Sequence, residues 1–172
     1  MNSWLRFLLL FVVMVFLQVT VGNSIHLFGV AIPFLYIYFI VRLPLSLSTN
    51  WTMTVAFLLG LTIDVFCNTP GMNALSCVIV AALRKWLLKL YTPRVEDYAE
   101  VEPSIRNFGL SLYVRYTLTL SFCFCLTLFL VESLSFFDAG RLALRVFSST
   151  ILTFLVILGM DSLTKSGREK RS

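Results

Sequence analysis

Apolar residues gather into six runs, which polar or turn-forming residues separate from one another. A helix needs about 20 mainly apolar residues to cross the hydrocarbon core of a bilayer, and each run approaches that length. The predicted spans cover residues 4–21, 25–41, 51–67, 72–91, 108–131 and 140–160. This pattern predicts an all-α, polytopic integral membrane protein of about six transmembrane helices, forming a single domain over residues 1–172.

Two of these runs carry residues that bear on helix geometry. The second contains Pro33, which is expected to kink a transmembrane helix whose neighbours satisfy the freed carbonyl. The fourth has an uncharged stretch of only twelve residues, Met72–Leu83, before Arg84. It reaches a spanning length if the helix continues to Tyr91, while its basic side chains snorkel to the interface.

The first run also has the length of the apolar region of a secretory signal sequence. However, its leading segment carries Arg6 as the sole basic residue, and Gly22-Asn23-Ser24 is a poor match to a small-residue cleavage site. We therefore predict a retained first helix over residues 4–21.

Composition agrees with a lipid environment. Of the 172 residues, 58% are hydrophobic and 13% are charged, with a mean hydropathy of +0.87. A soluble domain has about 25% charged residues, and a water-soluble globule of this size would not bury so much apolar surface. The net charge of +5 does not indicate a nucleic-acid binder, because the basic residues sit mostly at the ends of the apolar runs rather than on one water-facing surface.

The distribution of basic residues predicts the orientation in the membrane. With six spans and a cytoplasmic N-terminus, twelve Lys and Arg residues fall on the cytoplasmic side, in loop 92–107 and tail 161–172 among other segments. The outer side receives two, Arg141 and Arg145. We therefore expect a protein of the bacterial inner membrane with both termini in the cytoplasm.

Charged residues within spans are costly, so each needs a partner, a cavity or a nearby interface. Asp64 lies about one turn from the outer end of its span, at the depth of Arg141 and Arg145, and we predict an ion pair with one of them. Arg115 and Asp161, near the inner ends of the last two spans, form a second predicted pair. The alternative for each charge is snorkelling to the interface without a specific partner.

Sequence motifs for catalysis or for metal and cofactor binding are missing. The four cysteines form no CxxC pair, and His26 is the sole histidine, so no metal site is expected. No G-x-S-x-G, H-E-x-x-H, phosphate-binding glycine loop or dinucleotide fingerprint occurs. We predict a protein without enzymatic activity and without a cofactor.

The third and fourth runs hold a distinctive hairpin, which reads GLTIDVF from Gly60 and, after a short gap, PGMNAL from Pro70. Gly60 would allow close helix packing, Pro70-Gly71 would reverse the chain, and Asn73 could cap the next helix or hydrogen-bond across the turn. The pattern resembles the "GLxxD … PxGxNAL" signature of the bacterial rod-shape-determining MreD family. The matching positions are Gly60, Asp64, Pro70, Gly71, Asn73, Ala74 and Leu75.

One departure from the signature is that Pro70 and Gly71 are adjacent, where the family usually has a residue between them. This affects the expected shape of the turn more than the hairpin itself. The alternative reading is a helical hairpin in an unrelated membrane protein.

The resemblance implies a non-enzymatic scaffold of the cell-elongation machinery, which directs peptidoglycan synthesis and rod shape. The partners that it implies are an MreC-like single-span protein, the actin-like MreB filament, and the RodA polymerase with its transpeptidase. The family's core is similar to the S components of energy-coupling vitamin transporters, so a substrate-binding S component is the alternative function. Candidate pocket residues for that alternative are Tyr36, Tyr38 and Trp51.

Two basic clusters, Arg84–Lys89 and Lys165–Arg171, are candidates for binding anionic membrane lipids or a cytoplasmic partner. The simpler interpretation is that they set the orientation of the chain in the membrane.

Overall fold

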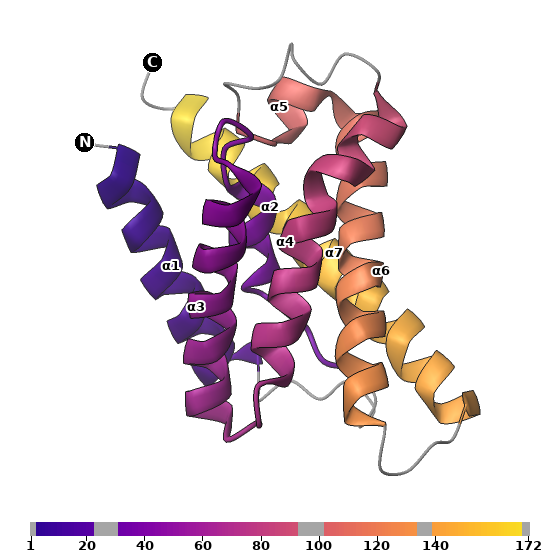
Figure 1. Ribbon diagram of the computed structural model, residues 1–172. Helices are drawn as coiled ribbons and strands as arrows, with labels where there is room; N and C mark the ends of the chain where they lie inside the picture. The colour runs from indigo at the N-terminus through magenta and orange to yellow at the C-terminus, as the bar shows by residue number, and fades with distance from the viewer. Residues whose placement is uncertain (1–2, 23–30, 93–101, 134–138, 170–172) are drawn as a thin grey trace.

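A computed structural model describes residues 3–22, 31–92, 102–133 and 139–169 of the chain, and this part is helical (Figure 1). Within these described ranges, three helices are long and apolar enough to cross a membrane: α3 (Thr49–Cys67), α6 (Leu110–Glu132) and the first 24 residues of α7 (Ala139–Glu169). The chain is therefore a helical membrane protein. The shorter elements and the less apolar long ones are α1 (Ser3–Thr20), α2 (Ile37–Arg42), α4 (Met72–Tyr91) and α5 (Ile105–Phe108).

The bounds of most long helices agree with the predicted apolar runs. Helices α1, α3, α4 and α6 begin and end within two residues of the ranges predicted for the first, third, fourth and fifth spans. Helix α4 is less apolar than the three candidate spans because Arg84, Lys85 and Lys89 lie in its second half. Helix α7 continues to Glu169, so the predicted tail begins inside a helix rather than after one.

The prediction of a continuous second helix over residues 25–41 is wrong in its described part. Helix α2 begins only at Ile37, and residues 32–34 around Pro33 are not helical. Proline has no backbone N–H and disfavours helical geometry in the residue before it, which accounts for the break in the helix at Ile32 and Pro33. Residues 23–30, including His26, lie outside the described part of the chain.

Side chains from distant helices supply the hydrogen bonds that this irregular segment lacks. The N–H groups of Ile32 and Phe34 donate to the Ser149 and Thr153 hydroxyls of α7, each at 3.1 Å. Gln18 of α1 accepts from the Leu35 N–H at 2.8 Å and donates to the Pro33 carbonyl at 3.2 Å. Non-helical backbone is tolerated at membrane depth only where protein groups satisfy it in this way.

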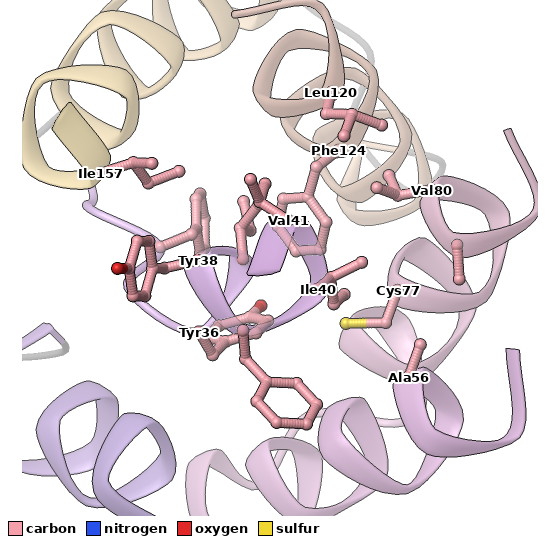
Figure 2. Packing of buried hydrophobic residues seen from close by; sticks show 14 of the residues in the cluster. Tyr36, Tyr38, Ile40, Val41, Ala56, Cys77, Val80, Leu120, Phe124 and Ile157 are labelled. Atoms are coloured by element: carbon pink, nitrogen blue, oxygen red, sulfur yellow. The ribbon is translucent and has the colours of Figure 1, made fainter. Parts of the chain in front are cut away.

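The short helix α2 lies at the centre of the bundle, and all six of its residues are buried. Figure 2 shows Ile40 lying toward Cys77 and Ala56, while Val41 lies toward Phe124. Helices α3 and α4 form a hairpin, and α4, α6 and α7 pack in sequence around α2. Large apolar side chains cover much of the outer surface, as expected for a surface in contact with lipid; they include Leu8, Phe16, Val65, Trp86 and Leu155.

The bundle has two distinct ends (Figure 1). At one end the turn 68–71 joins α3 to α4, and we call this the turn end. At the other end α1 begins, α4 ends and α7 ends, close to the short helix α5. Arg6, Arg42, Glu102 and Asp161 meet there, and we call it the charged end.

Candidate functional sites at the two ends of the bundle

The hairpin of α3 and α4 depends on a glycine at its closest approach. A Cβ atom added to Gly60 would lie 2.5 Å from the Ala74 Cα and 2.7 Å from the Asn73 carbonyl oxygen. Both atoms belong to the α4 backbone and are not free to move aside. Any larger residue at position 60 would therefore push the two helices apart.

Asp64 is buried four residues further along α3, and its carboxylate caps the N-terminus of α4. Oδ1 accepts from the Asn73 backbone N–H at 3.1 Å and the Asn73 side-chain amide at 2.9 Å. Oδ2 accepts from the Ala74 N–H at 2.8 Å, and Thr69 Oγ1 donates to Oδ1 at 2.5 Å. These backbone donors have no partner within their own helix, and the helix dipole favours negative charge at this position.

The turn between the helices uses two residues with positive φ. Asn68 ends α3 in the left-handed region, at φ 53°, and asparagine adopts this region more readily than most residues. Gly71 precedes α4 at φ 76°, where glycine has no steric penalty. The Thr69 N–H closes the end of α3 by donating to the Asp64 carbonyl at 3.0 Å. The adjacent Pro70-Gly71 pair thus forms a tight, internally bonded reversal.

The turn is also tied to the centre of the bundle. The Tyr36 hydroxyl donates to the Asn73 Oδ1 at 2.5 Å, while the amide nitrogen of the same side chain donates to Asp64. Tyr36 is fully buried and packs edge-to-face against Phe124 of α6. A continuous chain of contacts therefore links the turn to α2 and α6.

The predicted ion pair between Asp64 and Arg141 or Arg145 is wrong. Among the described residues, the donors to the Asp64 carboxylate come from its own hairpin: Thr69 in the turn and Asn73 and Ala74 in the first turn of α4. Arg145 pairs instead with Glu132 at the end of α6, at 2.9 Å, and its guanidinium lies 4.6 Å from the centre of the Phe129 ring.

The second predicted pair, Arg115 with Asp161, is also wrong. Arg115 is exposed on α6, and Asp161 accepts from Arg42 Nη1 at 3.1 Å and from the Ile105 N–H at 3.0 Å. Both carboxylate oxygens of this buried side chain are thus used. The prediction did place the partner of Asp161 at the correct end of the bundle, because Arg42 ends α2 at the charged end. Depth alone did not identify which arginine faces α7.

Glu102 completes a network at the charged end. Its Oε2 accepts from Arg42 Nη2 at 3.1 Å and from Arg6 Nη2 at 2.8 Å. The network joins α1, α2, α7 and the segment before α5. Sequence reasoning missed Arg42 and Glu102 as members of a site; the available signal was that Arg42 directly follows an apolar run.

Arg84 does not snorkel as predicted but is fully buried. Its guanidinium donates to the Leu43 carbonyl, just after α2, and its Nε donates to the Tyr116 hydroxyl at 3.1 Å. Lys85 donates to the Leu47 carbonyl at 2.6 Å. These two basic residues of α4 therefore hold the connection between α2 and α3.

In the described ranges no three His, Cys, Asp or Glu side chains gather to hold a metal ion. The Asp64 carboxylate is occupied by donors that position helices. The candidate pocket residues Tyr36 and Trp51 do not share a cavity, since Tyr36 is buried in the core and Trp51 is exposed on α3.

The fold and the two sites define a helical membrane protein with one rigid capped turn and one charged network. Comparisons with protein families, with curated proteins and with solved structures gave no match.

Proposed function

We propose that this chain is a non-enzymatic membrane scaffold of the bacterial cell-elongation machinery, similar to the MreD family, which helps direct peptidoglycan synthesis and rod shape. The observation that carries the proposal is the assembly of the motif residues into one unit. Gly60, Asp64, Asn73 and Ala74 contact one another directly, and Gly71 gives the turn its geometry. Residues that a family signature groups together would be expected to act together in this way.

The turn is built for shape rather than for chemistry. The side chains of Asp64, Thr69 and Asn73 bond to one another and to the Ala74 N–H, so they are not available to bind a substrate. Its outer surface is different: Asn68, Pro70 and Gly71 are exposed, and the large apolar residues Val65 and Phe66 are exposed beside them. A fixed turn with an apolar flank is suited to a membrane-spanning partner, and an MreC-like single-span protein is our candidate.

We further propose six crossings of the bacterial inner membrane with both termini in the cytoplasm. In this arrangement the charged end faces the cytoplasm and the turn end faces outward. The start of α1 and the end of α7 at the same end of the bundle are consistent with an even number of crossings. The other expected partners, MreB and RodA with its transpeptidase, remain part of the proposal.

The experiment is co-purification of the tagged full chain from native membranes in mild detergent. Wild type is compared with Phe66→Ala at the turn end and with Phe147→Ala on α7, a matched control because the two side chains are similarly exposed, 63% and 60%. We expect wild type and Phe147→Ala to recover an MreC-like single-span protein, and Phe66→Ala to recover several-fold less. Recovery of paired cytoplasmic ATPases with a coupling membrane subunit would instead establish the vitamin-transporter alternative.

A further inference from the structure

A cavity of about 190 Å³ lies between α1 and the charged end of the bundle. Its polar lining comes from Arg6, Tyr38, Arg42 and Glu102, and its apolar lining comes from Phe7, Leu9, Leu10 and Val13 of α1. The cavity is therefore amphipathic, with charged groups gathered at one end and hydrocarbon along the helix.

The apolar part is open to the surroundings of the bundle. Leu9 is 58% exposed and Val13 is 39% exposed, and both lie on the outer surface of a membrane helix. Positions 6, 9, 10 and 13 follow the helical repeat and share one side of α1. At about 1.5 Å of rise per residue, Arg6 and Val13 are separated by about 10 Å along the axis. The cavity continues as a groove from the charged end toward the hydrocarbon core.

The charged part has one exposed cation at its mouth. Two guanidinium groups and one carboxylate line it, and Asp161, buried 3.1 Å behind Arg42, offsets the charge of that arginine. Arg6 is 35% exposed and donates one Nη2–H to Glu102. Its other N–H donors have no protein acceptor in the described part of the chain. Guanidinium donors match the geometry of phosphate oxygens.

We propose that this groove binds one anionic phospholipid, with its phosphodiester at Arg6 and the start of an acyl chain along Leu9, Leu10 and Val13. The phosphodiester of a phosphatidylglycerol headgroup accepts from the Arg6 donors that Glu102 leaves free, and this headgroup carries no cation. The headgroup of phosphatidylethanolamine carries an ammonium beside its phosphodiester, and the guanidinium groups of Arg6 and Arg42 repel it. The inference depends on the chain being a membrane protein and not on the proposed scaffold role.

The test is native mass spectrometry of the full chain, incubated in detergent with equal amounts of phosphatidylglycerol and phosphatidylethanolamine. Arg6→Gln removes the exposed donor, and Val13→Trp fills the groove without touching its charges. Arg115→Gln is the matched control, since it removes an exposed arginine from α6. All four proteins must elute as the same single species.

We expect wild type and Arg115→Gln to retain one phosphatidylglycerol in preference to phosphatidylethanolamine. Arg6→Gln should lower that retention by about tenfold, because a charge-assisted hydrogen bond is lost, and Val13→Trp should abolish it. The proposal is overturned if wild type retains the two lipids equally. It is also overturned if Arg6→Gln and Arg115→Gln lose lipid to the same extent, or if Val13→Trp retains lipid like wild type.

Discussion

Replacing Asp64 by asparagine tests whether one buried carboxylate holds the α3–α4 hairpin together. The substitution preserves the size of the side chain and removes its charge. One carboxylate oxygen becomes an amide NH₂ group. Because every neighbour of Asp64 in the cap donates a hydrogen bond to it, the new NH₂ group must face a donor.

The least costly orientation places the amide nitrogen at the Ala74 N–H, 2.8 Å away, and keeps the oxygen for the three remaining donors. A buried N–H that loses its acceptor costs about 1–3 kcal/mol. Loss of a negative charge at the N-terminus of α4 costs about 0.3–2 kcal/mol more. We therefore expect Asp64→Asn to lower the free energy of unfolding by about 2–4 kcal/mol.

Equilibrium unfolding in detergent, titrated with sodium dodecyl sulfate and followed by circular dichroism, measures this difference. Glu132→Gln is the control, because it removes a partly exposed carboxylate from its pair with Arg145. Such pairs contribute about 0–1 kcal/mol. If Asp64→Asn is no more destabilising than Glu132→Gln, the carboxylate does not hold the hairpin and our account of the turn is incorrect.

Three further predictions use the same bundle. Gly60→Ala should cost about 1–3 kcal/mol because its Cβ overlaps the α4 backbone, while Gly159→Ala, with no atom within 4 Å of the added Cβ, should be neutral or slightly stabilising in the same titration. Thr153→Val should cost about 1–3 kcal/mol by leaving a buried backbone N–H without its acceptor, and a loss below about 0.5 kcal/mol would contradict that bond. For the proposed topology, Pro70→Cys should react with a membrane-impermeant maleimide in intact cells and Asn107→Cys only after lysis, in a chain whose native cysteines are replaced; the opposite result would reverse the orientation.

In the α3–α4 hairpin, the sequence predicted the key residues of the site but not the partner of Asp64. The motif identified Gly60, Asp64 and the Pro70-Gly71 reversal, and Asn73 does hydrogen-bond across the turn. The partner of Asp64 was predicted from depth in the membrane, and depth favoured a distant arginine. The observed donors are backbone N–H groups, which every residue carries and which no sequence pattern distinguishes.

The charged end shows the same limit. The sequence indicated that Arg42, Arg115 and Asp161 lie near helix ends, and depth alone led to the prediction that Asp161 pairs with Arg115. Selection between the two arginines depends on the direction in which each side chain leaves its helix and on which helices are neighbours. Those quantities are set by packing around α2, which brings Arg42 against α7.

Sequence by itself determined the class of protein and the bounds of most helices, because hydropathy and helix length are local properties that the lipid solvent imposes on each segment. Pro33 predicted a kink, but only the tertiary structure revealed how far the irregular segment extends and that it lies at the centre of the bundle. Its backbone N–H groups are satisfied by Ser149 and Thr153, which lie 117 and 119 residues further along the chain. A hydrogen bond between such distant residues exists only once the helices have packed, so no local pattern could predict it.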